Sequence, residues 1–310
     1  MKTAWLYAGQ GSQKKGMGAD LYEKYPSFRA AFDSAELSFD LKKVCFEDPD
    51  EVLNQTEYTQ PCMEAFACGV TAVLKEKGLK PDYVAGLSLG EYSALEAAGV
   101  FDAKTAIETV AYRGKVMSEA SKGMDVAMYA VMGLSEEDLK ACCEKASAKG
   151  VVSICNYNCP GQLVIGGEKA AVEECVRLAG EAGARRSVAL AVSGPFHTSL
   201  MKPAGDALAE YFKKMDLGAP IVTVLYNYLG KENTENMPIA DILVMQVQRS
   251  VRMDMILMNL FNKGVRRFIE IGPGKAITGF VKKTAKQLMV DDFECYTIDG
   301  AEDLEKVLEL

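Results

Sequence analysis

The chain has 310 residues, of which 49% are hydrophobic and 25% charged, the ordinary balance of a folded, soluble protein. No apolar run approaches the roughly 18 residues of a membrane span, and the first residues lack the long apolar region of a signal peptide. The net charge of −8 argues against nucleic acid as the main partner, so we expect a cytoplasmic protein with neither a membrane nor a nucleic-acid partner.

The chain opens with an apolar strand over residues 3–8, followed by a loop rich in glycine. The loop does not match a dinucleotide fingerprint, because Lys14 stands where the third glycine is required. It is either a loop that brings backbone N–H groups close to a ligand or a plain turn. Helical patterns then predict helices over residues 17–25, 27–38, 50–54 and 59–77, with Pro61 in the first turn of the last one.

Residues 84–92 are typical of a short buried strand, one serine and the start of a helix. Gly86 and Gly90 flank Ser88 in the spacing G-x-S-x-G. That spacing suits a tight strand-to-helix turn, in which the serine has a strained backbone and its neighbours must be small. Ser88 is therefore either an exposed nucleophile at the end of a strand or an ordinary turn serine.

The helix predicted over residues 102–121 contains Arg113. This arginine either extends along the protein surface to water or holds a carboxylate of the substrate through a planar, two-point contact. Residues 125–192 follow another pattern, strand, helix, two strands, helix and strand, which is typical of a ferredoxin-like unit.

After residue 193 the strand–helix alternation resumes. Helices are predicted over residues 199–215, 239–248, 252–262 and 302–308, and strands over 221–227, 267–271 and 295–298. The loop at 272–275 is not a phosphate-binding loop, because Ile269 replaces its first glycine. We predict an α/β protein with a hydrolase-like, doubly wound, mainly parallel sheet in residues 1–124 and 193–310, and an inserted ferredoxin-like small domain in residues 125–192.

The numbers of histidine and cysteine residues limit the kinds of site that the chain can form. His197 is the only histidine and lies where the insert returns to the large domain, so it is either the base that activates Ser88 or a residue without a catalytic role. The nine cysteines include no Cys-x-x-Cys pair, which favours free thiols over a disulfide framework or a zinc site. We expect neither a metal nor a cofactor.

Several motifs, taken together and in order, are those of one family. They are Gly9-Gln10-Gly11-Ser12-Gln13, Thr59-Gln60-Pro61, Gly86-Leu87-Ser88-Leu89-Gly90-Glu91, Tyr112-Arg113-Gly114, Asn156-Tyr157-Asn158, Gly194-Pro195-Phe196-His197 and Glu270-Ile271-Gly272-Pro273-Gly274. Through them nearly the whole chain resembles the malonyl-CoA:acyl-carrier-protein transacylases of bacterial fatty acid synthesis.

The resemblance implies a role for each matching residue. Ser88 would attack the malonyl thioester and His197 would be its base. The backbone N–H groups of Gln10 and Leu89 would form the oxyanion hole. Arg113 would hold the free carboxylate of the malonyl group.

Other positions follow from the same resemblance. A main-chain carbonyl would orient the histidine, and the matching position is Gln246. Phe196 would crowd the central carbon of the acyl group, which favours malonyl over methylmalonyl. Leu87 and Pro195 depart from the histidine and alanine that the family often has there, and they bear on the fine acyl selectivity.

The resemblance implies an enzyme that uses malonyl-CoA and acyl carrier protein in a ping-pong reaction through a malonyl-serine. We expect it to act as a monomer, although nothing in the sequence fixes the oligomeric state. Arg185 and Arg186, at the edge of the insert, either meet a phosphate or the carrier protein or are simply solvated. A serine esterase or thioesterase would use the same serine and base, and a carrier-binding protein without catalysis is a third class. A stable acyl-enzyme would distinguish the transferase from both.

Overall fold

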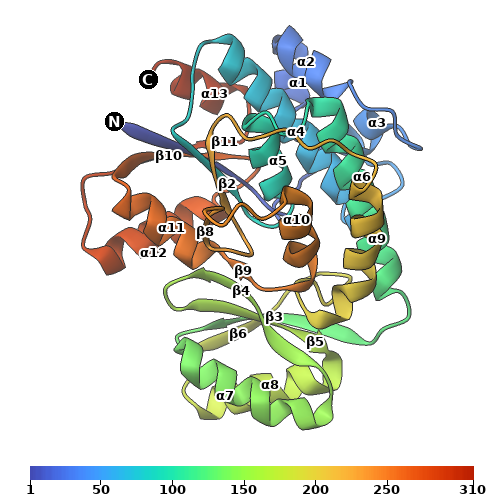
Figure 1. Cartoon of the computed structure of the whole chain (residues 1–310), viewed down its shortest axis with the longest axis vertical. Coiled ribbons are helices and arrows are strands. Elements are labelled where there is room, and N and C mark those ends of the chain that lie inside the picture. Colours follow the sequence, from blue (N-terminus) through green and yellow to red (C-terminus); the bar gives the residue numbers. More distant parts are fainter.

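The computed structural model describes residues 1–310 and contains two separate β-sheets (Figure 1). The larger sheet has six strands in the spatial order β11 (Glu294–Ile298), β10 (Val265–Ile271), β1 (Lys2–Tyr7), β2 (Tyr83–Gly86), β7 (Thr223–Tyr226) and β8 (Lys231–Glu232). Every neighbouring pair is parallel except β7 and β8. The mainly parallel sheet that the strand–helix alternation predicts is therefore present.

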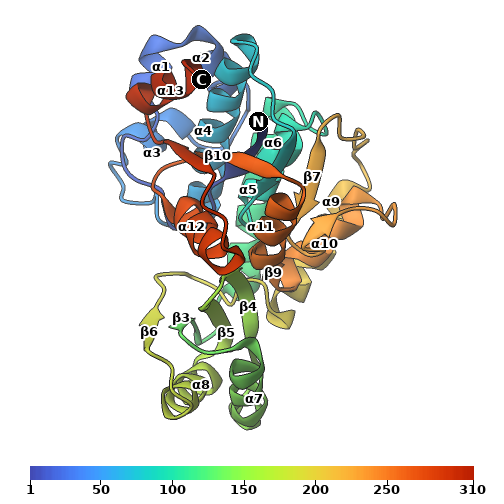
Figure 2. The ribbon, with the colours of Figure 1, turned by 90° about the vertical axis from the view of Figure 1, so that its left-hand side faces the viewer.

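The smaller sheet has five strands in the order β6 (Arg186–Ala189), β3 (Val126–Met132), β5 (Gln162–Glu168), β4 (Val152–Cys159) and β9 (Val251–Arg252). Its strands alternate along the chain with α7 (Glu136–Ala146) and α8 (Lys169–Glu181), which lie together beneath the sheet (Figure 1, Figure 2). β9 comes from outside residues 125–192 and pairs in parallel with β4, so backbone hydrogen bonds join the two parts of the molecule.

Eleven α-helices belong to the remainder of the chain. They are α1 (Ala19–Lys24), α2 (Pro26–Phe32), α3 (Leu41–Phe46), α4 (Thr56–Glu76), α5 (Gly90–Ala97), α6 (Ala103–Ser121), α9 (Lys202–Phe212), α10 (Ile239–Gln248), α11 (Met253–Asn262), α12 (Ala276–Leu288) and α13 (Ala301–Leu308). Short 3₁₀ helices occupy Ser147–Lys149 and Ser199–Met201. None of these helices has the length and apolar character needed to span a membrane.

Apolar side chains cover both faces of the large sheet. Trp5 and Tyr7 of β1 belong to one buried cluster, whereas the alternate residues Ala4 and Leu6 belong to another. This alternation follows from the two-residue period of a strand. The second cluster includes residues of α11 and α12, and the first includes residues of α4, α5 and α6. A sheet covered on both faces explains why the buried parts of its central strands, Ala4–Tyr7 of β1 and Val84–Gly86 of β2, carry no charged residue.

The helix predicted over residues 50–54 is wrong. Asp48 has a left-handed backbone (φ 38°), and its carboxylate accepts the N–H groups of Val52 (2.8 Å) and Leu53 (3.0 Å). A side chain that takes these donors favours a turn over a helix. The helix lies just before it instead, as α3, where the carboxylate of Asp40 caps the N–H of Lys43 at 2.9 Å.

Other elements also differ from the sequence expectations. α2 ends at Phe32, whereas the predicted helix continues to residue 38, and the short strands β8 and β9 were not predicted. α4 begins at Thr56, so Pro61 lies inside the helix and not in its first turn. The sequence pattern did not predict α12, because its cap is remote. The Glu270 carboxylate, at the end of β10, accepts the N–H groups of Ile277 (3.0 Å) and Thr278 (2.7 Å). The helix N-terminus after residues 272–275 is thus occupied by the protein's own carboxylate.

Candidate active site

Ser88 lies at a sharp turn between β2 and α5. Its backbone is left-handed (φ 55°), a conformation that costs a residue with a side chain about 1–3 kcal/mol. A side chain at Gly86 would overlap the backbone of Gly90, and one at Gly90 would overlap the carbonyl of Tyr7. Both positions of G-x-S-x-G therefore need glycine for steric reasons. The turn places the serine hydroxyl above the carboxyl end of the sheet.

The hydroxyl of Ser88 and the imidazole of His197 are in contact. Ser88 Oγ lies 2.7 Å from His197 Nε2, and His197 Nδ1 lies 2.7 Å from the backbone carbonyl oxygen of Gln246. A carbonyl can only accept, so Nδ1 holds the proton of the neutral ring. Nε2 is then free to accept the proton of the serine hydroxyl, which is the arrangement of a nucleophile and its base.

The imidazole of His197 is held in its neutral form. Burial lowers its pKa to about 4, and the positive charge of Arg113 acts in the same direction. The hydrogen bond to the carbonyl of Gln246 opposes this shift. Near neutral pH, Nε2 is therefore unprotonated and available as a base.

Arg113 reaches the site from α6 and is 0% exposed, so an extension to surface water is wrong. Its Nη1 donates to Gln60 Oε1 at 2.7 Å, and its Nη2 donates to Ser88 Oγ and to Gln246 Oε1, both at 3.1 Å. Its Nε has no hydrogen-bond partner. All its partners are neutral, and no carboxylate lies within ion-pair distance of this buried cation.

The nearest buried acids do not neutralise Arg113. Burial raises the pKa of Glu64 and of Glu91 to about 8 in each case, although Arg113 itself acts to lower both values. Both carboxyl groups are therefore largely protonated at neutral pH. Since arginine keeps its charge, the site has a net positive charge beside the serine, and an anionic ligand group would be stabilised there.

Gln246, in α10, contacts three parts of the site. Its backbone oxygen accepts from His197, its side-chain oxygen accepts from Arg113, and its side-chain Nε2 donates to the carbonyl oxygen of Ser88 at 2.7 Å. The N–H of Leu89 points away from that carbonyl, because the two belong to one trans peptide plane. The side chain of Gln246 thus fixes both the guanidinium of Arg113 and the peptide between Ser88 and Leu89.

Gln10 and Leu89 both line the cavity in front of Ser88. Neither backbone amide donates a hydrogen bond within the protein. An N–H group without an internal partner, next to a nucleophile, is what an oxyanion hole requires. The side chain of Gln10 is held separately, by a 3.0 Å hydrogen bond to Thr56 Oγ1.

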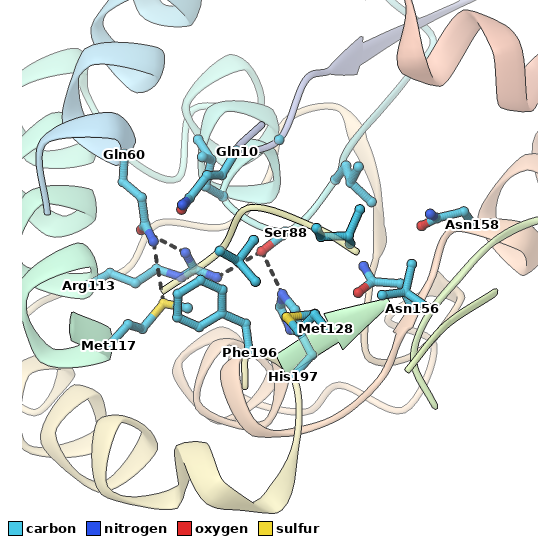
Figure 3. Close-up of a pocket in the computed structure, with 16 residues that line it drawn as sticks. Gln10, Gln60, Ser88, Arg113, Met117, Met128, Asn156, Asn158, Phe196 and His197 are labelled. Carbon is cyan, nitrogen blue, oxygen red and sulfur yellow. Dashed lines mark hydrogen bonds between the residues drawn. The ribbon is translucent and has the colours of Figure 1, made fainter. Parts of the chain in front are cut away.

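Figure 3 shows the cavity with the serine, histidine and arginine converging near its centre. Phe196 lies beside Arg113 and His197, and Asn156 and Asn158 lie on the opposite side. The remaining lining residues are Gly9, Gln10, Gln60, Leu87, Leu89, Met117, Met128, Val164, Leu190 and Val192. The small sheet contributes part of this lining, so the cavity lies between the two sheets.

Sequence reasoning did not give Gln60 or Asn227 a place in the site. Gln60 is buried within the apolar helix α4. The only sequence signal was a polar side chain inside an apolar helix, which needs a hydrogen-bond partner. Asn227 follows β7, next to the strand that precedes Ser88, and its Oδ1 accepts the N–H of Ser88 at 2.7 Å. Polar residues at the carboxyl ends of neighbouring parallel strands are a general signal of a site.

Comparison with known proteins places this geometry among acyltransferases. The family model "Acyl transferase domain" matches residues 4–306. A protein of Bacillus subtilis (strain 168), named malonyl CoA-acyl carrier protein transacylase, is 42% identical over 290 residues, covering 93% of this chain and 92% of that protein.

Solved structures agree with this comparison. The crystal structure of malonyl CoA-acyl carrier protein transacylase from Clostridium perfringens is 35% identical, with a TM-score of 0.94, over 100% of this chain and 96% of that one. A malonyl-transacylase solved in complex with its type II PKS acyl-carrier protein is 38% identical, with a TM-score of 0.93, over 100% and 99%.

Proposed function

This chain belongs to the malonyl-CoA:acyl-carrier-protein transacylases of the acyl transferase family, and on that premise we propose that it moves malonyl groups by a ping-pong reaction through Ser88. Malonyl-CoA would acylate the serine, and the phosphopantetheine thiol of acyl carrier protein would then take the acyl group. The enzyme class follows from the family. The covalent intermediate and the residue roles are our proposal.

The observation that supports this proposal most is the buried guanidinium of Arg113, 3.1 Å from Ser88 Oγ and without a carboxylate partner. A serine and a base alone would serve any acyl group. A cation beside them would favour an acyl group that has its own carboxylate, because a planar two-point pair is the strongest contact that arginine makes. Malonyl has such a group, and acetyl does not.

In the first half-reaction, Ser88 Oγ would attack the thioester carbonyl carbon while its proton moves to His197 Nε2. The N–H groups of Gln10 and Leu89 would bind the oxygen that becomes negative, each contributing on the order of 3 kcal/mol at the transition state. The C–S bond then breaks, and the proton on His197 passes to the sulfur of CoA. The second half-reaction would reverse these steps with the carrier thiol.

The side chain of Phe196 is buried and borders the cavity next to His197. We propose that it limits the space around the central carbon of the acyl group, which would favour malonyl over methylmalonyl. Leu87 also lines the cavity and would add to this selectivity. All these groups come from one chain, which is compatible with action as a monomer.

We also propose that residues 1–124 and 193–310 form a hydrolase-like catalytic domain and that residues 125–192 are a ferredoxin-like insert. The order β3, α7, β4, β5, α8 and β6 in the smaller part supports this division. So does a separate buried cluster that includes Val131, Ile154 and Ile165. The cavity between the two parts would admit the long pantetheine arm.

Intact-protein mass spectrometry after mixing with malonyl-CoA tests the proposed function. We expect the protein to gain one malonyl group, to lose it when a carrier thiol is added, and to gain none in the Ser88→Ala variant. A steady release of free malonate without an acyl-enzyme would identify a thioesterase instead. Absence of both products would leave only a binding protein.

A basic groove lies between the small sheet and α12. Arg185, Arg186, Lys283 and Lys286 line it, and none of the four contacts a carboxylate within ion-pair distance. Lys283 Nζ donates only to the neutral side-chain oxygen of Gln162, at 3.0 Å. Unpaired cations on one surface attract an anionic partner and raise its association rate. We propose that this groove receives the acidic carrier protein.

Reversing two charges, in the double variant Arg185→Glu and Arg186→Glu, should raise the KM for carrier protein by roughly tenfold at low salt, and by less at high salt because ions screen the attraction. Malonyl-enzyme formation should stay unchanged. Lys42→Glu with Lys43→Glu, an exposed pair on α3, is the matched control. Equal increases in the KM for malonyl-CoA and for the carrier would assign the groove to phosphate groups.

A further inference from the structure

Asn227, directly after β7, holds the turn that contains Ser88 from both sides. Its Oδ1 accepts the N–H of Ser88 at 2.7 Å, and its Nδ2 donates to the carbonyl oxygen of Gly86 at 2.6 Å. These two peptide groups lie before the serine, on the strand side of the turn. Asn227 is fully buried, so water does not compete for either bond.

The asparagine is itself held in place by its backbone. Its N–H donates to a carboxyl oxygen of Glu91, in the first turn of α5, and its carbonyl oxygen accepts from the N–H of Arg252 at 2.9 Å. Glu91 is also fully buried. A closed set of contacts therefore joins the end of β7, the turn at Ser88 and the start of α5.

We propose that Asn227, held by Glu91, is a positioning residue that fixes the direction of the Ser88 hydroxyl. The proposal rests on the proposed function, because it concerns the rate at which Ser88 is acylated. A left-handed serine persists only where its surroundings determine it. Asn227 fixes the peptide before Ser88 while Gln246 fixes the peptide after it, so the two amides together leave the serine backbone no freedom to relax.

The consequence for the reaction is geometric. Ser88 Oγ must keep its 2.7 Å contact with His197 and also face the acyl carbon. A displacement of about 1 Å at a reacting group can cost on the order of a hundredfold in rate. Asn227 touches neither the acyl group nor the imidazole, so it would act only through the serine backbone.

The test is the rate of malonyl-serine formation in the Asn227→Ala variant, measured by rapid quench and mass spectrometry. We expect this rate to fall about a hundredfold, while the Kd for malonyl-CoA, measured in a Ser88→Ala background, changes less than about twofold. Asn233→Ala is the matched control. Asn233 also binds one backbone N–H and one backbone C=O, both of Met237, but it does not line the cavity in front of Ser88.

Acylation of the Asn227→Ala variant at the wild-type rate would overturn the inference. An equal loss in rate and in malonyl-CoA affinity would overturn it too, because that pattern indicates a general loss of structure. A wild-type chain that forms no malonyl-serine would overturn the proposed function instead, and the inference with it.

Glu91 supplies a second, milder variant. Glu91→Gln keeps an oxygen that accepts the N–H of Asn227, and burial raises the pKa of the native carboxyl to about 8, so a neutral amide is a close substitute. We expect near wild-type acylation in Glu91→Gln and a fall of about tenfold in Glu91→Ala. Wild-type acylation in both variants would overturn the part assigned to Glu91.

Discussion

Replacing His197 with alanine should slow malonyl-serine formation by about 10⁴- to 10⁶-fold, the range found when single residues that activate a serine nucleophile are removed. The reason is that the chain has no second histidine and that Nε2 is the only base within 2.7 Å of the Ser88 hydroxyl. Arg113, the other group that contacts the hydroxyl, can only donate. Rapid-quench mass spectrometry of the acyl-enzyme measures the effect.

The pH dependence of the wild-type enzyme is the companion measurement. The pKa of His197 is lowered to about 4, so the neutral base persists at low pH and is lost only as the pH falls through that value. The acylation rate should thus be nearly constant between about pH 5.5 and 7, above the pKa of His197 and below the range in which Glu64 and Glu91 lose their protons. A His197→Ala variant that keeps more than a tenth of the wild-type rate would remove the histidine from its proposed role.

Local sequence was sufficient for the turn at Ser88. The reason is steric, because a side chain at Gly86 or Gly90 would overlap backbone atoms. Glycine is therefore required two residues before and two residues after the serine, and this spacing can be recognised in the sequence. The single histidine was likewise recognisable as the candidate base, because the chain has no other imidazole. The alternating pattern of residues 125–192 also matched the strands and helices that form there.

Features that depend on distant partners were not accessible in this way. Asn227 binds a turn 139 residues earlier in the chain, and no local pattern distinguishes it from any other loop asparagine. The cap of α12 comes from Glu270, in the preceding strand, and not from the residue next to the helix. The burial of Arg113 likewise depends on how α6 packs against the rest of the protein, and the sequence of α6 alone does not determine that packing.

In the proposed mechanism, the charge of Arg113 would act on the base as well as on the substrate. It is one of the causes that lower the pKa of His197. A malonyl carboxylate paired with Arg113 would offset that charge and make the imidazole a stronger base. An acetyl group would leave the charge in place, so the same arginine would both bind the correct acyl group and weaken the reaction of the wrong one.

The Arg113→Ala variant should therefore lose malonyl transfer and keep acetyl transfer. Loss of a buried charge pair costs roughly 2–5 kcal/mol, so kcat/KM for malonyl-CoA should fall about 30-fold or more. Removal of the cation should leave kcat/KM for acetyl-CoA unchanged or higher, because the pKa of His197 rises. Arg113→Lys, which keeps the charge but not the planar fork, should lie between the two. Acylation rates with malonyl-CoA and with acetyl-CoA give the ratio of the two kcat/KM values, and thermal unfolding shows whether each variant is folded. An unaltered malonyl-to-acetyl ratio in a folded Arg113→Ala chain would contradict this role.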